Sequence, residues 1–199
     1  MENSEGLGER KKRESRERII AAAATLFIER GARAVSLDEV AEAAQVARRT
    51  LFNYFPSKEE LLHATAAPML EEAVELCDAI LGRERAGREA LGLDEVIELC
   101  LGLWRSWGRR LSLLYSMDLG ESERLAKLHE RYVARFRQLV SAALASDAGA
   151  RPSSRAAGRI VYRCFVPLLL ALDDGATAPA ELERRFAAGM RGLIKGAAS

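Results

Sequence analysis

Two adjacent arginines, Arg48 and Arg49, are followed within one short segment by polar side chains that suit contacts to a nucleic acid. Arginine is the side chain that most often reads guanine in the major groove, through two parallel hydrogen bonds. The residues that follow, whose side chains suit phosphate oxygens, are Thr50, Asn53, Tyr54 and Lys58. The alternative is that both arginines are only the solvated end of a short helix, and helical periodicity alone does not decide between these interpretations.

A short helix is predicted just before the arginines. Ser36 and Glu39 have the spacing of a capping box, in which each side chain satisfies the other residue's backbone amide. This helix is expected to end near Ala44 or Gln45, so a tight turn joins it to a second short helix that begins with the two arginines. Proteins use such a pair of helices to place the second one in the major groove.

Two longer helices are expected on either side of this pair. Before the pair, apolar residues recur at helical spacing, at Ile20, Ala23, Ala24 and Phe27. Gly31 is expected to end this first helix. After the pair, Pro56 disfavours helical geometry at Phe55. A second capping box, Ser57 with Glu60, then opens a long helix that continues to about residue 80.

The run from Val35 to Leu62 resembles the DNA-binding signature of the tetracycline-repressor (TetR) family, and the match extends over about residues 16–62. Its most specific portion is Thr-Leu-Phe-x-Tyr-Phe-Pro-Ser-Lys-Glu-x-Leu. The resemblance implies that Ser36 and Leu37 open the supporting helix at the DNA backbone and that residues 47–53 form the recognition helix. By the same resemblance, bases or phosphates are contacted by Arg48, Arg49 and Asn53, and phosphates by Thr50, Tyr54 and Lys58.

The chain departs from the family pattern at two positions. Gln45 stands where the turn usually has glycine, and Ala47 stands where the recognition helix often has a serine cap. A residue with a side chain is strained at positive φ, and a missing cap costs about 1 kcal/mol. Both departures are expected to loosen the recognition helix, unless the turn has a different geometry.

Residues 1–15 are charged, lack apolar periodicity and are expected to form a flexible basic arm. Basic side chains gather near its end, at Arg10, Lys11, Lys12, Arg13 and Arg16. They form either a solvated tail or an arm along the DNA. We expect DNA contacts from Arg13 and Arg16, because the family's additional N-terminal residues lie beside the duplex.

The composition excludes several classes of protein. With 30 Lys and Arg against 29 Asp and Glu, the net charge of +1 neither indicates nor excludes a nucleic-acid partner. The three cysteines are widely spaced and have no nearby histidine, so we expect no disulfide, no metal site and no cofactor. The longest strongly apolar run, residues 164–172, is far shorter than the roughly 20 residues of a membrane span. A cytoplasmic protein is expected.

Residues 63–199 carry no recognisable motif, and amphipathic segments predict an effector-binding and dimerisation domain built of helices. Bulky and apolar side chains concentrate in it and would line a pocket for an apolar effector. These candidates are Cys100, Trp104, Trp107, Tyr115, Met117, Tyr132, Phe136 and Phe165. The alternative for each of them is that it fills the helical core.

The last two segments are predicted to form the interface of a homodimer. Each has one apolar stripe, and two such helices from each subunit would form a four-helix bundle about a two-fold axis. The stripes consist of Ile160, Cys164, Leu168 and Leu172, then Leu182, Phe186, Met190 and Leu193. Packing within one chain is the competing explanation for each stripe.

The sequence therefore predicts an all-α protein with a three-helix DNA-binding domain at residues 16–62 and a larger helical domain at residues 63–199. The expected function is a repressor that binds a palindromic operator in double-stranded DNA as a homodimer and that a small apolar effector releases. The two histidines have no catalytic partners in any motif, so an enzyme is not expected. The alternatives are an adaptor or an architectural DNA binder that does not respond to a small molecule.

Overall fold

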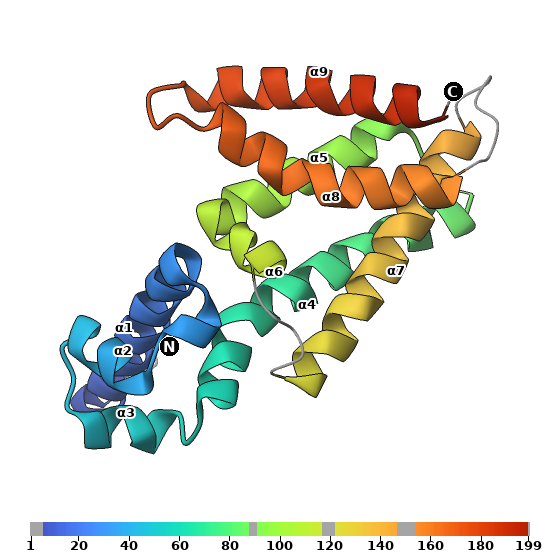
Figure 1. The fold of residues 1–199 in the computed structure, drawn as a ribbon. Helices are drawn as coiled ribbons and strands as arrows, with labels where there is room; N and C mark the ends of the chain where they lie inside the picture. The colour runs from blue at the N-terminus through green and yellow to red at the C-terminus, as the bar shows by residue number, and fades with distance from the viewer. Residues whose placement is uncertain (1–5, 88–90, 117–121, 147–153, 199) are drawn as a thin grey trace. The chain divides into compact units, whose positions relative to one another are not determined.

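The computed structural model describes residues 6–87, 91–116, 122–146 and 154–198, and throughout these ranges every regular element is a helix (Figure 1). The all-α fold class is therefore confirmed. The chain divides into two compact units. The first comprises Met1–Pro68 and Leu113–Ala126, and the second comprises Met69–Ser112 and Lys127–Ser199. The boundary after residue 62 that the sequence suggests between the two functions stays a prediction.

The first unit is built on α1 (Leu7–Arg30), η1 (Ala32–Ala34), α2 (Leu37–Ala43) and α3 (Arg48–Tyr54), with the start of α4 (Lys58–Arg85). The short α6 (Leu113–Ser116) packs against α1, and α1 packs against α2. The core contains three members of the predicted apolar face of α1, because Ala23, Ala24 and Phe27 are all at most 2% exposed. The fourth, Ile20, is half-buried, and its neighbour Ile19 is completely buried instead. At Gly31 a φ of 78° ends α1 as expected, since glycine adopts positive φ without strain.

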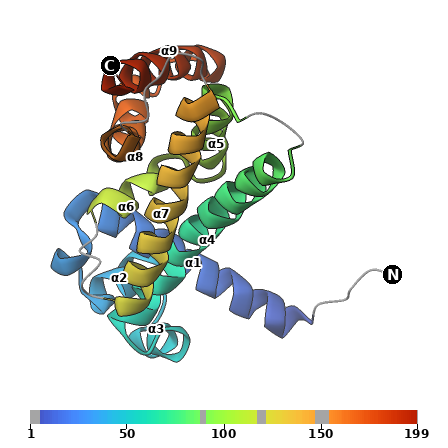
Figure 2. The same cartoon turned by 90° about the vertical axis from the view of Figure 1, so that its right-hand side faces the viewer.

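The flexible arm expected over residues 1–15 is helical from Leu7 onward, which corrects that prediction for the described residues. In Figure 2 the N-terminal half of α1 extends beyond the helices with which it packs. Oppositely charged side chains one turn apart stabilise this exposed part: Lys12 lies 2.7 Å from Glu9, and Arg10 lies 2.8 Å from Glu14. The missing apolar periodicity suggested a flexible arm, but ion pairs between neighbouring turns stabilise this helix instead.

The long helix after Pro56 starts as predicted and ends later than predicted. The amide of Glu60 donates to the Ser57 hydroxyl at 3.2 Å, while the Glu60 carboxylate pairs with Arg124 at 3.3 Å. The helix α4 continues through Gly82 to Arg85, five residues past the predicted end, because a glycine weakens a helix without preventing it. The division between the two units falls within α4, next to Pro68.

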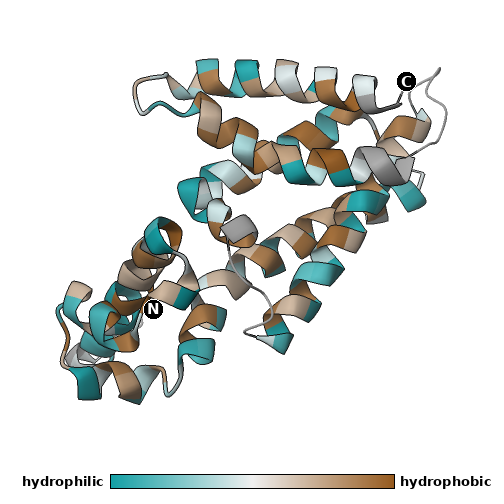
Figure 3. Ribbon diagram, in the orientation of Figure 1, coloured by the Kyte–Doolittle hydropathy of each residue, from teal (hydrophilic) through white to brown (hydrophobic). Residues whose placement is uncertain are grey.

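The second unit contains most of α4, α5 (Leu93–Trp107), η2 (Gly108–Ser112), most of α7 (Glu123–Ser146), α8 (Ser154–Leu172) and α9 (Pro179–Ala198). Hydrophobic and hydrophilic residues are interspersed along α7 and α9 (Figure 3), as in helices that bury one face. Close approach joins α8 to α9, since a Cβ on Gly189 would lie 3.1 Å from Leu168.

Candidate nucleic-acid interface

The N-terminus of α2 is fixed by the predicted capping box. The Ser36 amide donates to the Glu39 carboxylate at 2.8 Å, and the Glu39 amide donates to the Ser36 hydroxyl at 3.2 Å. Arg30, at the end of α1, adds an ion pair of 2.7 Å to the same carboxylate. Hydrogen bonds from the backbone and hydroxyl of Ser36, and then Arg30, lower the pKa of Glu39 to about 2. Ser36 and Leu37 are thereby held at the start of α2.

The turn between α2 and α3 contains both predicted departures from the family pattern. Gln45 has a φ of 54°, and it is the only described residue other than glycine with a positive φ. Ala47 caps α3 without any side-chain hydrogen bond. The amide of Val46 nevertheless donates to the carbonyl of Ala41 at 3.0 Å, which closes the turn. The turn therefore keeps its positive φ despite the glutamine.

The apolar side of α3 anchors it to the first unit. Leu51 is completely buried, and Phe55, which follows the helix in extended geometry, is 3% exposed. Because Leu51 faces inward, the opposite side of α3 is left for solvent, and Arg48, Arg49 and Asn53 are all exposed.

Arg48 makes two contacts that the sequence analysis missed. Its Nε lies 3.0 Å from Asp38 Oδ1 of α2, and its guanidinium carbon lies 5.5 Å from the centre of the Phe52 ring, within the range of a cation–π contact. The spacing of Arg48 and Phe52, four residues apart on one helix, was a signal for the second contact. No sequence pattern near Arg48 indicated its contact with Asp38, which lies ten positions earlier.

The predicted phosphate contacts lie on α3 and just after it. Thr50, Tyr54 and Lys58 are half-buried. The Lys58 ammonium donates to the Arg33 carbonyl at 3.2 Å, and the Arg16 guanidinium lies 5.5 Å from the centre of the Phe55 ring. Tertiary packing therefore brings Arg16 of α1 to the C-terminal end of α3. Arg13, one turn earlier, lies 3.7 Å from Glu17.

The candidate effector residues lie in several environments. In the second unit Tyr132, Phe136 and Phe165 are completely buried, and they form one aromatic cluster with Tyr162 at centroid distances of 5.7 to 6.2 Å. Cys100 is also buried, and its burial raises the pKa of its thiol. Trp104 and Trp107 are half-buried. Met117 and the side chain of Tyr115 lie outside the described residues.

Polar side chains bind to members of both aromatic groups, the cluster of α7 and α8 and the tryptophans of α5. His129 and Tyr162 share a hydrogen bond between α7 and α8, and burial lowers the pKa of His129 and raises that of Tyr162 to about 12. The Trp107 indole donates to Glu72 of α4 at 2.6 Å. The cluster thus packs as a core, and an effector pocket at these residues stays a prediction.

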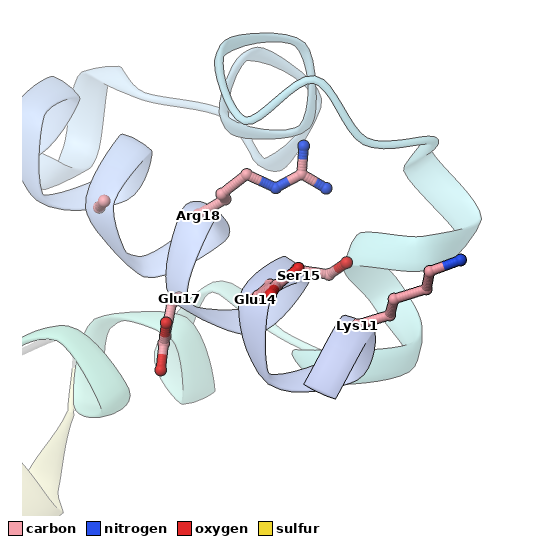
Figure 4. Close-up of a pocket in the computed structure, with 6 residues that line it drawn as sticks. Lys11, Glu14, Ser15, Glu17 and Arg18 are labelled. Carbon is pink, nitrogen blue, oxygen red and sulfur yellow. The ribbon is translucent and has the colours of Figure 1, made fainter. Parts of the chain in front are cut away.

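A surface hollow of about 740 Å³ lies along α1, far along the sequence from those candidates (Figure 4). Its lining carries charges of both signs, from Lys11, Glu14, Glu17 and Arg18 together with Ser15 and Ala21. Such a lining does not suit an apolar molecule. None of the predicted effector residues contributes to it.

The predicted dimer stripes differ in exposure. On α8, Ile160 is 39% exposed, and Cys164, Leu168 and Leu172 are half-buried. Within the α9 stripe only Leu193 is exposed, at 36%. The other three members of the α9 stripe are buried within their own chain at 5% or less, which corrects their assignment to the interface: Leu182, Phe186 and Met190. They pack inward because α9 must cover the rest of its unit.

Within the described residues, no helix is long and apolar enough to cross a membrane. The same residues hold no group of three or more His, Cys, Asp or Glu side chains that would bind a metal ion.

The N-terminal part of the chain is similar in sequence to known regulatory proteins. Residues 19–65 match the model for bacterial regulatory proteins of the tetR family. Over 59 residues the chain is 41% identical to the HTH-type transcriptional regulator TcmR of Streptomyces glaucescens. That match covers 30% of this chain and 26% of TcmR, so it spans only about a quarter of that relative.

Two solved structures extend the likeness over the whole fold. AmtR of Mycobacterium smegmatis has a TM-score of 0.69 at 25% identity, over 90% of this chain and 86% of AmtR. NalD of Pseudomonas aeruginosa, the secondary repressor of the MexAB-OprM multidrug efflux pump, has a TM-score of 0.58 at 21% identity, over 91% of this chain and 96% of NalD. The second likeness concerns the fold alone. Residues 19–65, which hold the signature helices, are thus similar to bacterial regulatory proteins of the tetR family, and the helical fold of the chain is similar to that of AmtR.

Proposed function

We propose that this protein is a sequence-specific DNA-binding repressor that acts as a homodimer and that a small apolar effector releases from its operator. The observation that supports DNA reading most directly is the outer side of α3, where Arg48, Arg49 and Asn53 are exposed while Leu51 anchors the helix. The N-terminal residues of a recognition helix contact base edges. Regulators of this family are transcription factors and not enzymes.

The phosphate contacts follow from the same arrangement. Ser36 and Leu37 start α2, the supporting helix that the family resemblance places at the DNA backbone, and we infer that they contact phosphate there. Thr50, Tyr54 and Lys58 supply further donors around α3, and Arg16 and Arg13 extend the basic surface along α1. Each phosphate neutralised adds about 0.9 to the slope of binding affinity against salt on logarithmic scales.

Dimerisation is proposed through the exposed part of α8 and α9. Ile160 and Leu193 are the large apolar side chains that the described surface exposes, at 39% and 36%. Half-buried Cys164, Leu168 and Leu172 continue this surface along α8. A two-fold axis would hold two recognition helices at the separation of paired half-sites, about 34–36 Å or a multiple of it.

The response to an effector is proposed for the second unit. Opening the aromatic cluster of α7 and α8, or the surface near Trp104 and Trp107, would provide an apolar pocket with few polar groups. A ligand shifts an equilibrium only by its different affinities for the two states, so the effector must bind the DNA-free form more tightly. NalD, which shares the fold, is itself a repressor.

The test is selection of bound sequences from a random DNA pool by the purified protein, the Arg48→Ala/Arg49→Ala variant and a matched control. Arg184→Ala/Arg185→Ala is that control, because it removes an adjacent pair of exposed arginines from α9. Wild type and control should enrich an inverted repeat and bind it ~10³ times more tightly than random DNA, and the α3 variant should not. Enrichment of the same repeat by the α3 variant would show that other residues read the bases, and no enrichment by wild type would favour an adaptor or architectural role.

A further inference from the structure

We propose that Asp38 is a positioning residue that sets the base preference of Arg48. This inference rests on the proposed DNA-reading function. Arg48 is the first residue of α3, the end of a recognition helix that contacts base edges, and Asp38 lies in the first turn of α2. The turn at Gln45 brings the two side chains to an Nε to Oδ1 distance of 3.0 Å.

The two contacts of Arg48 restrict its guanidinium group from different sides. The carboxylate of Asp38 binds Nε, and the Phe52 ring lies 5.5 Å from the guanidinium carbon. Nη1 and Nη2 are then the nitrogens that remain for a base, and an arginine uses two parallel donors to bind guanine O6 and N7. An arginine without such contacts loses much of its rotamer freedom on binding, and the two contacts of Arg48 would reduce this loss.

The pair is too exposed to be explained by stability. The side chain of Arg48 is 70% exposed and that of Asp38 is 55% exposed, and exposed ion pairs contribute little to folding. A carboxylate at the start of α2 also repels the phosphates that Ser36 and Leu37 are proposed to contact. Asp38 therefore weakens binding to any DNA, and its compensating effect is the orientation of Arg48.

This combination predicts opposite changes in two affinities. Replacing Asp38 by asparagine removes one negative charge, which should strengthen binding to scrambled DNA. The same change replaces the carboxylate that binds Nε of Arg48 by a neutral amide, and this weaker contact should reduce discrimination between operator and scrambled DNA by about tenfold, within what one bidentate contact to guanine provides. A residue that only stabilised α2 would weaken both affinities together.

The experiment measures dissociation constants of the full chain for the selected operator and for a scrambled duplex at one salt concentration. The variants are Asp38→Asn, Asp38→Glu, Arg48→Ala and the double variant Arg48→Ala/Asp38→Asn. The control is Glu42→Gln, which removes the same charge from an exposed position of α2. Circular dichroism checks that each variant has the helical content of wild type.

The expected result is a ratio of affinities that falls about tenfold in Asp38→Asn and stays near wild type in Glu42→Gln. Asp38→Glu, which keeps the carboxylate, should retain most of the ratio. Asp38→Asn should have no effect on the ratio when Arg48 is already alanine. Equal ratios for Asp38→Asn and Glu42→Gln would overturn the inference while leaving the proposed function intact. A wild-type protein without any preference for its selected operator would overturn both.

Discussion

The segment α2 to α3 of the first unit and the helices α7 and α8 of the second unit solve different physical problems. Each of α2 and α3 has seven residues, and their geometry depends on a capping box, a strained turn and the anchor Leu51. The helices α7 and α8 have 24 and 19 residues and meet through an interior of aromatic rings. One segment needs particular residues at particular positions, whereas the other needs apolar residues of about the right volume.

This difference explains why a family signature is recognisable in residues 19–65 and not in the second unit. A hydrophobic core accepts many combinations of apolar side chains when volume and pattern are kept. A base-reading surface does not, because the hydrogen-bonding groups that it exposes have no substitutes. The part of the chain that would recognise an effector is therefore the part in which the sequence is least informative.

The largest expected effect is the loss of packing at Phe136. This side chain is completely buried, and its ring lies within 6.2 Å of those of Tyr132, Tyr162 and Phe165. Phe136→Ala should cost about 3–5 kcal/mol of unfolding free energy, and Phe136→Leu clearly less. Urea denaturation followed by tryptophan fluorescence measures it, because both tryptophans, Trp104 and Trp107, belong to the second unit.

If Phe136→Ala lowered the free energy of unfolding by less than about 1 kcal/mol, the description of α7 and α8 as a closely packed core would be wrong. It would mean that the ring borders space into which its neighbours do not fit closely, which is how a residue of an effector pocket behaves rather than a core residue.

A smaller effect, of opposite sign, is expected at the turn of the first unit. Gln45 has a φ of 54°, where a side chain is strained and glycine is not. Gln45→Gly should stabilise this unit by about 0.5–1 kcal/mol, because relief of strain exceeds the entropy that glycine gains in the unfolded chain. Hydrogen exchange of the amides in α2 and α3 measures the change.

The matched variant for the turn is Gln45→Ala, which shortens the side chain and keeps the strain. It should give no gain in protection. Equal gains for alanine and glycine would show that the glutamine side chain, and not the backbone angle, limits the stability of the turn.

The smallest expected effect is the acid dependence of the α2 cap. The pKa of Glu39 is lowered from 4.5 to about 2 in the folded protein, so the charged carboxylate favours the folded state above pH 4.5. That contribution should decline as the pH falls from about 4.5 to 2. Thermal unfolding of wild type and Glu39→Gln, compared between pH 7 and pH 2.5, should show a difference that shrinks in this window.

Glu42→Gln serves as the reference for the cap, since Glu42 lies on the same helix and outside the capping box. A Glu39 effect that does not depend on pH between 7 and 2.5 would argue that the loss comes from side-chain packing and not from the charged cap.

Expectations that depended on neighbouring residues were the most accurate. The capping box of Ser36 and the departure of Phe55 from helical geometry before Pro56 were predicted, and the structure contains them. Two geometries were left open for the turn at Gln45, and the structure has the one with a positive φ. The helical start at Leu7 was missed because charged pairs, rather than an apolar face, stabilise it. A window that searches for apolar periodicity does not detect such a helix.

Expectations about faces of helices were less accurate. The α9 stripe was assigned to a dimer interface, yet Leu182, Phe186 and Met190 are buried within the chain. An amphipathic stripe has the same sequence pattern whether it packs on its own chain or on a partner. Which of the two applies depends on the other helices of the unit, and these are not adjacent in sequence.

The sequence by itself determined the helical fold class, the two short helices and their caps, and the two arginines at the start of the second helix. Capping, turn strain and helical periodicity act over a few residues, so they can be read from a short window. Only the tertiary structure decided that Asp38 contacts Arg48, that Arg16 contacts Phe55, and that three of the four residues of the α9 stripe are buried. Those contacts depend on how separate helices pack, which is set by the volume and burial of many side chains together.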